Sequence, residues 1–161
     1  MKPIDPHDIQ FVRLPEISPD RIMKHMSDPR VAAHLPLMTS PWDSAQVQSF
    51  VTAKEMYWKR DGLGHWAILH RGDYVGWGGF QREGKDWDYG LVLTADSFGL
   101  GNAITRKALE FARNDPRISS VTFLLPPTRR NLGALRRLGA VSEGMVTYDD
   151  AGFQKFRLQT P

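Results

Sequence analysis

The sequence predicts an α+β fold in which helices flank a mixed, mostly antiparallel central sheet. Residues 20–34 and 43–61 carry apolar residues at helical spacing, and residues 65–93 then change to short β-type runs. A predicted helix over residues 100–114 stands between two strand-like segments, and two more strands close the chain. Because helices and strands are mixed in this way, we expect helices to cover a sheet of mixed strand directions.

The N-terminal part of the chain is predicted to contain one strand and three helices. The strand is expected over residues 11–17, and Ser18-Pro19 then fits a helix start, with serine as the cap and proline at the first helical position. Asp28-Pro29 interrupts the apolar pattern, so two short helices are expected instead of one. A longer helix is expected to open at residues 40–43 and to end at Asp61-Gly62.

The remainder of the chain is predicted to be rich in strands. Three consecutive strands are expected, over residues 65–70, 73–80 and 87–93. Arg71-Gly72 fits a hairpin turn between the first two. Thr128 is a candidate cap for a last helix that runs to Leu138, and Gly139 fits the C-terminal end of that helix. The other expected strands cover residues 120–125, 141–148 and 153–159.

Composition limits the class of protein. The 161 residues are expected to form a single domain, residues 1–161, and the 41% hydrophobic and 24% charged content is ordinary for a globular chain. No apolar run approaches the roughly 18 residues of a membrane-spanning helix, and the N-terminus lacks the apolar core of a secretory signal. We therefore expect a cytoplasmic protein without membrane contact. The absence of cysteine excludes disulfides, thiolate metal sites and cysteine nucleophiles.

The charge distribution gives little reason to expect a nucleic-acid partner. The formal charge is only +3, and acidic residues are interspersed with basic ones along most of the chain. The exception is a cluster formed by Arg129, Arg130, Arg136 and Arg137. This cluster is either a solvated helix face or a site for a compact polyanion such as phosphate, and it is the one feature that supports an RNA-binding module.

Metal and serine-hydrolase chemistry are not expected. His65 and His70 are an odd number of positions apart on one predicted strand, so their side chains point to opposite faces. The remaining histidines have no matched partners in the sequence: His7, His25 and His34. No G-x-S-x-G nucleophile turn occurs.

Two glycines, Gly99 and Gly101, stand where the helix after the third of the consecutive strands must begin. A phosphate-binding P-loop would need Lys and Ser or Thr after the last glycine, and a dinucleotide fingerprint would need Gly or Ala at Ile104. Both are excluded. Either the free N–H groups from Gly99 to Ala103 bind an anion at the helix N-terminus, or the glycines form a tight left-handed turn that binds nothing.

The segment FGLGNA, from Phe98 to Ala103, resembles a turn of the GNAT superfamily of N-acetyltransferases. There the pattern Gln/Arg-x-x-Gly-x-Gly/Ala binds the pyrophosphate of acetyl-CoA, and this chain matches it at Gly101 and Ala103. Phe98 departs from it. An aromatic residue at this position resembles the branch that acetylates ribosomal-protein N-termini. In the same branch the preceding strand is similar to WDYGLVL, with Asp88 at an acidic position and Gly90 at a glycine.

A second segment, TRRNLGALRRLGA from Thr128 to Ala140, keeps the spacing of the GNAT pattern Asn-x-x-Ser-x-x-x-Leu-x-x-Leu-Gly-Phe. Asn131 stands where serine is usual, and Leu135 stands where many members have tyrosine. The resemblance therefore implies a GNAT fold with acetyl-CoA as co-substrate and without a metal. The implied cofactor-binding residues are Leu93, Thr94, Phe98, Gly99, Leu100, Gly101, Asn102, Ala103, Arg130 and Asn131.

Two residues are candidates for catalysis, Asp88 and Asn131. Asp88 alternates with the aromatic row of Trp87 and Tyr89 and lies on the opposite face of its strand, where it is either a general base or a strand-entry acid in solvent. Asn131 can donate a hydrogen bond to the leaving thiolate but cannot supply a proton. Tyr89, Tyr148 or solvent are the alternative proton donors.

We therefore expect an N-acetyltransferase that moves an acetyl group from acetyl-CoA to a primary amine, either a protein N-terminus or a small molecule. The alternative is a GNAT-like domain that binds CoA or a metabolite without turnover. Trp77 and Trp87, with Phe80, are core residues by composition but could also line an acceptor cleft. A monomer and a homodimer are both compatible with the sequence.

Overall fold

The computed structural model describes residues 3–33, 41–127, 132–148 and 150–160. Its described part contains a seven-stranded sheet with the spatial order β1-β2-β3-β4-β5-β7-β6. All neighbouring strands are antiparallel except β4 and β5, which are parallel. The strands are β1 (Ile9–Val12), β2 (His65–His70), β3 (Asp73–Glu83), β4 (Asp86–Leu93), β5 (Ser120–Leu125), β6 (Val141–Tyr148) and β7 (Ala151–Gln159).

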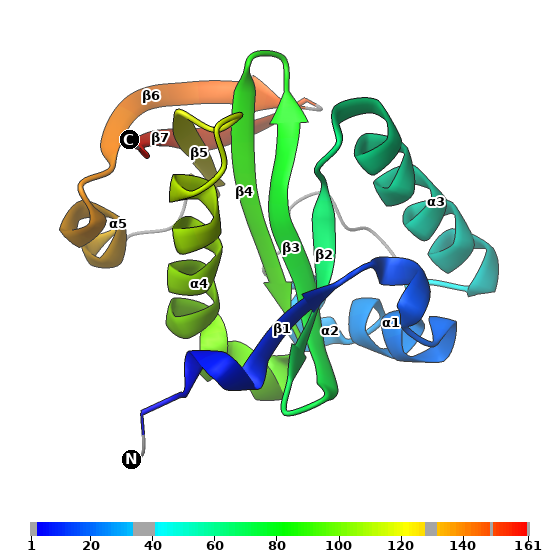
Figure 1. Ribbon diagram of the computed structural model, residues 1–161. Helices are drawn as coiled ribbons and strands as arrows, with labels where there is room; N and C mark the ends of the chain where they lie inside the picture. The colour runs from blue at the N-terminus through cyan, green and yellow to red at the C-terminus, as the bar shows by residue number, and fades with distance from the viewer. Residues whose placement is uncertain (1–2, 34–40, 128–131, 149, 161) are drawn as a thin grey trace.

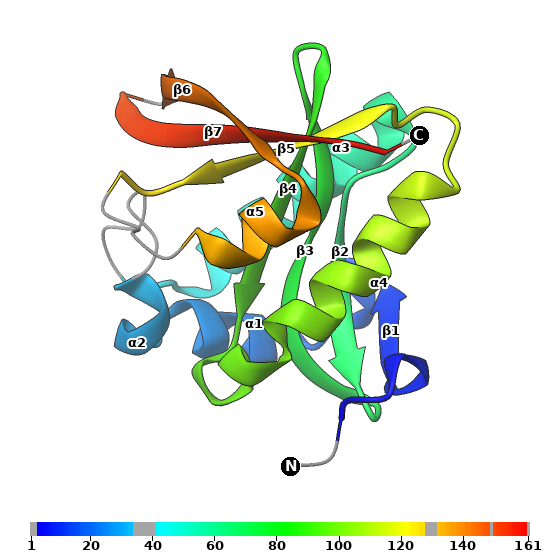
Figure 2. The same ribbon diagram turned by 90° about the vertical axis from the view of Figure 1, so that its left-hand side faces the viewer.

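Helices cover both faces of the sheet (Figure 1). One face packs against α1 (Pro19–Met26) and α3 (Ser44–Asp61), with Ile22, Val47 and Tyr74 in one buried cluster. The short α2 (Pro29–Ala32) follows α1. The opposite face packs against α4 (Gly101–Arg113), and α5 (Gly133–Leu138) lies on the same side (Figures 1 and 2). The two faces are called the α3 side and the α4 side below.

Most elements form where the sequence predicts them. The break at Asp28-Pro29 separates α1 from α2, and the Asp28 side chain accepts a hydrogen bond from the N–H of Arg30. Asp43 caps α3 by accepting from the N–H of Gln46, and Gly62 ends the helix in the left-handed conformation. Gly139 ends α5 in the same way. These boundaries follow from local side-chain and backbone chemistry, which the sequence contains in full.

The predicted first strand over residues 11–17 is wrong in its boundaries. β1 covers Ile9–Val12, and a 3-10 helix follows over Leu14–Glu16. Pro15 lacks an N–H, and the Glu16 side chain accepts a hydrogen bond from the N–H of Arg13, so the chain turns here instead of continuing the ladder. The predicted last helix begins only at Gly133, and its proposed cap Thr128 lies outside the described residues.

β4 and β5 form a fork. They pair at Trp87–Val121, Asp88–Thr122 and Tyr89–Phe123, and no further pair joins them within the described chain. Figure 2 shows β5 leaving β4 after this short contact. On its other edge β4 stays paired with β3 as far as Leu93. Residues Gly90–Leu93 therefore have one edge without a neighbouring strand, which we call the open edge of β4.

Two glycines of β3 face β4 across the paired edge, behind the open one. Gly76 and Gly78 have φ angles of 154° and 159°, which residues other than glycine rarely adopt. A Cβ atom at these positions would collide with the backbone carbonyl oxygens of Val92 and Gly90. The two glycines are thus required by the packing of β3 against the forked part of β4.

Candidate functional site

The turn around Gly99 and Gly101 leads directly from β4 into α4. A 3-10 helix covers Ala95–Leu100, and α4 begins at Gly101 with φ −55° and ψ −45°. Neither glycine is among the residues with positive φ, so the interpretation as a left-handed turn is wrong. Leu100 provides no side-chain cap to α4, and the first turn contains no acidic residue. The positive end of the helix dipole is therefore not neutralised from within its own first turn.

The space around these glycines is open. A Cβ atom at Gly99 would meet nothing within 4 Å among the described residues, and one at Gly101 would meet only Leu93 Cδ1 at 3.7 Å. Since alanine would fit the backbone and the space at both positions, the fold by itself does not explain why both are glycine. An anion that contacts the N–H groups directly would explain it, because a side chain there would stand in its way.

The other predicted cofactor-binding residues fall into two groups. Those from Leu93 to Ala103 are brought together by β4, the 3-10 helix and the first turn of α4. Within this group Leu93 is buried, Phe98 is 46% exposed, and the N–H of Thr94 donates to the carbonyl of Val75 at 2.8 Å. Arg130 and Asn131 lie outside the described residues.

Asp88 lies at the point where the fork closes. Its Oδ1 accepts a hydrogen bond of 2.9 Å from the hydroxyl of Thr122, its partner in the parallel ladder. Burial raises the pKa of Asp88 to about 7, and the Thr122 hydroxyl opposes that rise by stabilising the ionised carboxylate. The interpretation of Asp88 as a strand-entry acid in solvent is therefore wrong, because the residue is partly buried and its carboxyl group accepts a hydrogen bond from Thr122.

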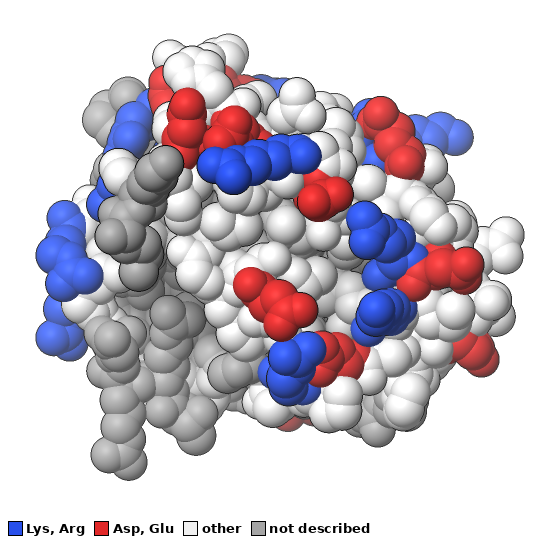
Figure 3. All heavy atoms as spheres, turned by 90° about the horizontal axis from the view of Figure 1, so that it is seen from below, with Lys and Arg blue, Asp and Glu red and all other residues white. Residues whose placement is uncertain are grey.

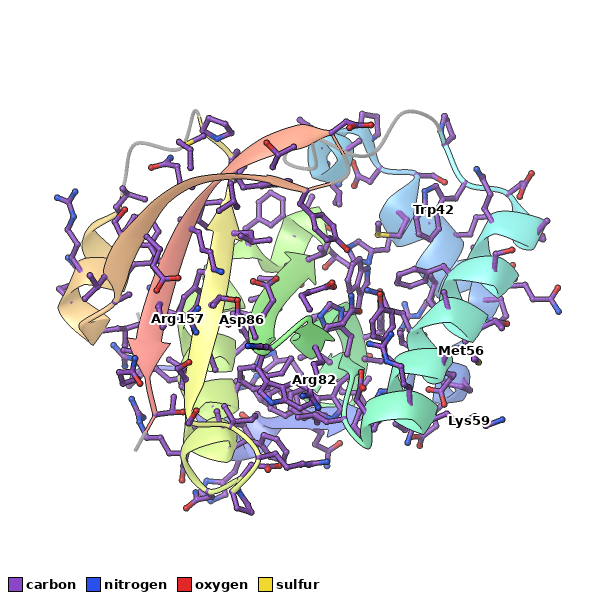
Figure 4. All side chains as sticks on the ribbon, turned by 90° about the horizontal axis from the view of Figure 1, so that it is seen from above. Trp42, Met56, Lys59, Arg82, Asp86 and Arg157 are labelled. Atoms are coloured by element: carbon purple, nitrogen blue, oxygen red, sulfur yellow. The ribbon has the colours of Figure 1, made fainter. Side chains whose placement is uncertain are left out.

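Charged residues surround Asp88 along the same face. Asp86, two residues earlier on β4, accepts from Lys155 at 2.8 Å and from Arg157 at 2.9 Å. Arg157 also donates to Glu143 at 2.8 Å. Figure 4 shows Asp86 and Arg157 directed at one another. The negative charge of Glu83 raises the pKa of Asp88, Lys155 lowers it and Asp86 raises it, so charges of both signs lie close to the fork.

Aromatic side chains are divided between the two faces of the sheet. Trp87, Tyr89 and Phe80 are buried on the α4 side in a cluster with Ala108 and Leu109. That placement confirms Trp87 and Phe80 as core residues and contradicts the alternative that these two side chains line an acceptor cleft. Trp77 lies on the α3 side, with its ring centroid 5.5 Å from that of His65.

The sequence reasoning missed a buried polar group on the α3 side. Lys54 Nζ of α3 lies 3.0 Å from His65 Nδ1 and 3.0 Å from Gln81 Oε1. It also lies 4.8 Å from the centre of the Trp77 ring, within cation–π range. Burial lowers the pKa of Lys54 to about 8, and burial together with the Lys54 charge lowers the pKa of His65 well below its usual value. In the sequence, this group could have been found from Lys54, a charged residue at a position on the apolar face of its predicted helix.

The tyrosines considered as proton donors occupy different places. Tyr89 is buried on the α4 side, where its hydroxyl lies 2.9 Å from Thr105 Oγ1, and burial raises its pKa. Tyr148 belongs to the edge strand β6, and its hydroxyl lies 3.4 Å from Glu83. Leu135 packs against the core cluster of the α4 side.

Two further observations concern metals and membranes. Among the described residues, no three His, Asp or Glu side chains come together in a group able to bind a metal ion. None of the described helices combines the length and the apolar character that crossing a bilayer requires. Figure 3 views the molecule from the end where α4 begins, and acidic and basic side chains are interspersed over the described part of that face.

No protein-family model and no curated protein sequence match this chain. Solved structures do. An acetyltransferase from Agrobacterium tumefaciens str. C58 superposes with a TM-score of 0.73 at 16% identity, over 94% of this chain and 90% of that one. RimL, a ribosomal L7/L12 α-N-protein acetyltransferase in complex with coenzyme A, gives 0.75 at 14% identity, over 98% and 96%.

A protein from Bordetella pertussis that is named a putative GNAT-family acetyltransferase superposes with a TM-score of 0.70 at 18% identity, over 98% of this chain and 99% of that one. The aminoglycoside acetyltransferase AAC(6')-Ib in complex with coenzyme A gives 0.71 at 16% identity, over 94% and 93%. Identities this low show a common fold. The chain therefore has the fold of the GNAT acetyltransferases, as its turn and strand patterns predict.

Proposed function

We propose that this protein is an acetyl-CoA-dependent N-acetyltransferase that acts on a primary amine. The observation that carries the proposal is the open edge of β4, which joins two features of complementary chemistry. At one end stands the uncapped N-terminus of α4 with its open space at Gly99 and Gly101. At the other end stands Asp88, whose pKa of about 7 suits a general base.

The residues present fit the parts of acetyl-CoA. The N–H groups from Gly99 to Ala103 would bind the pyrophosphate, because the helix dipole and the missing side chains favour a large anion. The amide-containing arm of the co-substrate would find backbone groups along Gly90–Leu93, an extended stretch of about 10 Å. Arg130 and Asn131 are proposed as further contacts to the phosphates and to this arm.

Bound acetyl-CoA supplies a thioester that an uncharged amine can attack. At pH 7 an α-amine is roughly a tenth neutral, whereas a lysine side chain is neutral at only about 0.04%, so an acceptor of high pKa needs a base. Asp88 would accept the proton, directly or through a water molecule. Its raised pKa makes it a stronger base than an ordinary aspartate while leaving about half of it ionised at pH 7.

The acceptor is proposed to be either a protein N-terminus or a small-molecule amine. Among the structural neighbours, RimL is named for a ribosomal protein and AAC(6')-Ib for aminoglycosides, so this fold accommodates acceptors of both kinds. Trp77, on the same side as Asp88, is the aromatic side chain proposed to contact the acceptor.

A second candidate function is binding of CoA or a related metabolite without turnover. Leu135 favours it, because this partly buried residue packs against the apolar core at a position where a tyrosine of the GNAT pattern would offer a hydroxyl. The two functions share the phosphate site and differ in whether an amine is acetylated.

The test is release of free CoA thiol from acetyl-CoA in the presence of a panel of amines. We expect amine-dependent release that falls by about 100-fold or more in Asp88→Asn, while stabilisation by acetyl-CoA persists. Asp73→Asn, which removes an exposed carboxylate at the start of β3, is the matched control. An unchanged rate in Asp88→Asn would exclude Asp88 from the mechanism, and acetyl-CoA binding without thiol release for any amine would favour the second function.

A further inference from the structure

The contacts of Lys54 determine which nitrogen of His65 carries a proton. Below its pKa of about 8, the Lys54 ammonium group has three N–H donors and no acceptor. His65 Nδ1, 3.0 Å away, must therefore accept, as Gln81 Oε1 does on the other side. Gln81 is held in this orientation because its amide nitrogen donates to Glu83 Oε1 at 2.8 Å. Since burial keeps the imidazole neutral, its hydrogen stands on Nε2.

This Nε2–H group is buried and has no hydrogen-bond partner among the described residues. It lies over Gly90, where an added Cβ atom would stand 3.6 Å from Nε2. Gly90 is the first residue of the open edge of β4, immediately after the last pair with β5. A buried donor without a partner costs about 1–3 kcal/mol, so a group that is held this firmly and left unpaired calls for a ligand.

Asp88 and Gly90 share one face of β4, about 6.6 Å apart along the strand. The carboxylate accepts hydrogen bonds and protons, and the imidazole N–H only donates. The two groups thus have opposite roles on either side of the position where the fork closes. A carbonyl oxygen that gains negative charge is the kind of atom that a neutral N–H donor stabilises, most strongly in a site of low dielectric.

We propose that His65 donates its Nε2–H to the acetyl carbonyl oxygen at Gly90, an inference that rests on the proposed acetyltransferase function. As the amine attacks, the C–N bond forms and the carbonyl π electrons move onto oxygen, which His65 binds. Asp88 takes the proton from the attacking nitrogen. The carbonyl then re-forms as the C–S bond breaks, and the electron pair of the C–S bond leaves on sulfur as the CoA thiolate. His65 keeps its proton throughout, and Lys54 and Gln81 act as positioning residues.

Gly90→Ala tests the proposal without disturbing the network. Gly90 is not among the residues with positive φ, and its added Cβ would make only ordinary contacts with the imidazole. The methyl group would cover Nε2, so we expect kcat to fall by about 100-fold while stabilisation by acetyl-CoA is retained. Gly152→Ala on β7, remote from the site, is the matched control. A kcat unchanged in Gly90→Ala would overturn the proposal.

A measurement independent of turnover uses protein with 15N-labelled histidine rings. At pH 7 the His65 signals should report the neutral Nε2–H form, and the Nε2–H resonance should move downfield when acetyl-CoA is added. A charged ring, a proton on Nδ1, or a resonance that saturating acetyl-CoA leaves in place would overturn the proposal. Failure of the wild-type protein to acetylate any amine would overturn the proposed function, whereas the spectra decide the role of His65 separately. Lys54→Met should abolish the fixed tautomer if Lys54 positions the ring.

Discussion

Thr122 on β5 donates a hydrogen bond of 2.9 Å to Asp88 on β4, and the two residues are direct partners in the only parallel ladder that the described strands form. Because the ladder ends one pair later, this hydrogen bond holds the carboxylate where β4 and β5 separate. Thr122 is only 2% exposed, so its hydroxyl is shielded from water. The fold thus fixes the candidate base through a neighbour from a strand more than thirty positions away in sequence.

The first prediction concerns the pH dependence of catalysis. Asp88 acts as a base only when ionised, so kcat/KM should rise with pH through about 7, the pKa of Asp88. Thr122→Val removes a hydrogen bond to the ionised form and should move this rise to higher pH. Thr122→Ser retains the hydroxyl and should leave it in place. Identical profiles for the valine and serine variants would show that the hydrogen bond does not tune Asp88.

The second prediction concerns stability. The folded protein holds a proton on Asp88 up to a pKa of about 7, whereas the unfolded chain loses it near 3.8. The unfolded state therefore binds fewer protons between these values, and the contribution of Asp88 to stability falls as pH rises from about 4 to 7. The free energy of unfolding of Asp88→Asn, measured relative to that of the wild type, should therefore be higher at pH 8 than at pH 4. Urea titrations at pH 4 and pH 8 measure this difference in free energy of unfolding, with Asp73→Asn as the control. A difference that does not change with pH would contradict the prediction.

The third prediction concerns the phosphate site. Gly101→Glu should fold, because φ of −55° suits any residue, the added Cβ meets only Leu93 at 3.7 Å, and acids suit the first turn of a helix. The new carboxylate should repel the pyrophosphate and abolish thermal stabilisation by acetyl-CoA, which for a ligand at 100 times its Kd is about 2.7 kcal/mol. Gln48→Glu, exposed on α3, controls for the added charge. A full acetyl-CoA shift in a folded Gly101→Glu protein would refute the site.

The fourth prediction concerns the glycines behind the open edge. Gly78→Ala should destabilise the protein severely, because φ of 159° disfavours alanine and the methyl group would collide with the carbonyl oxygen of Gly90. Backbone strain of this kind alone costs roughly 1–3 kcal/mol. Denaturant unfolding measures the loss, with Gly152→Ala as the reference for an ordinary strand glycine. Equal midpoints for the two variants would contradict the close packing of β3 on β4.

The sequence by itself determined the features that depend on neighbouring residues. The split between α1 and α2 follows from Asp28-Pro29, and the ends of α3 and α5 follow from Gly62 and Gly139, because caps and left-handed ends are made by a few consecutive residues. The turn at Gly99 and Gly101 was located for the same reason. The order of elements then predicted the α+β class and, with the turn motifs, the GNAT fold.

Only the tertiary structure decided the features that depend on residues distant in sequence. Asp88 is one acid among many in the chain, and its burial beside Thr122 exists only once β4 and β5 pair. Lys54, His65 and Gln81 come from a helix and two strands, and their hydrogen bonds follow from packing α3 against the sheet. Local propensities do not specify where two strands cease to pair. The fork, its base and its unpaired imidazole are therefore properties of the assembled sheet, since burial and long-range pairing set both their geometry and their pKa values.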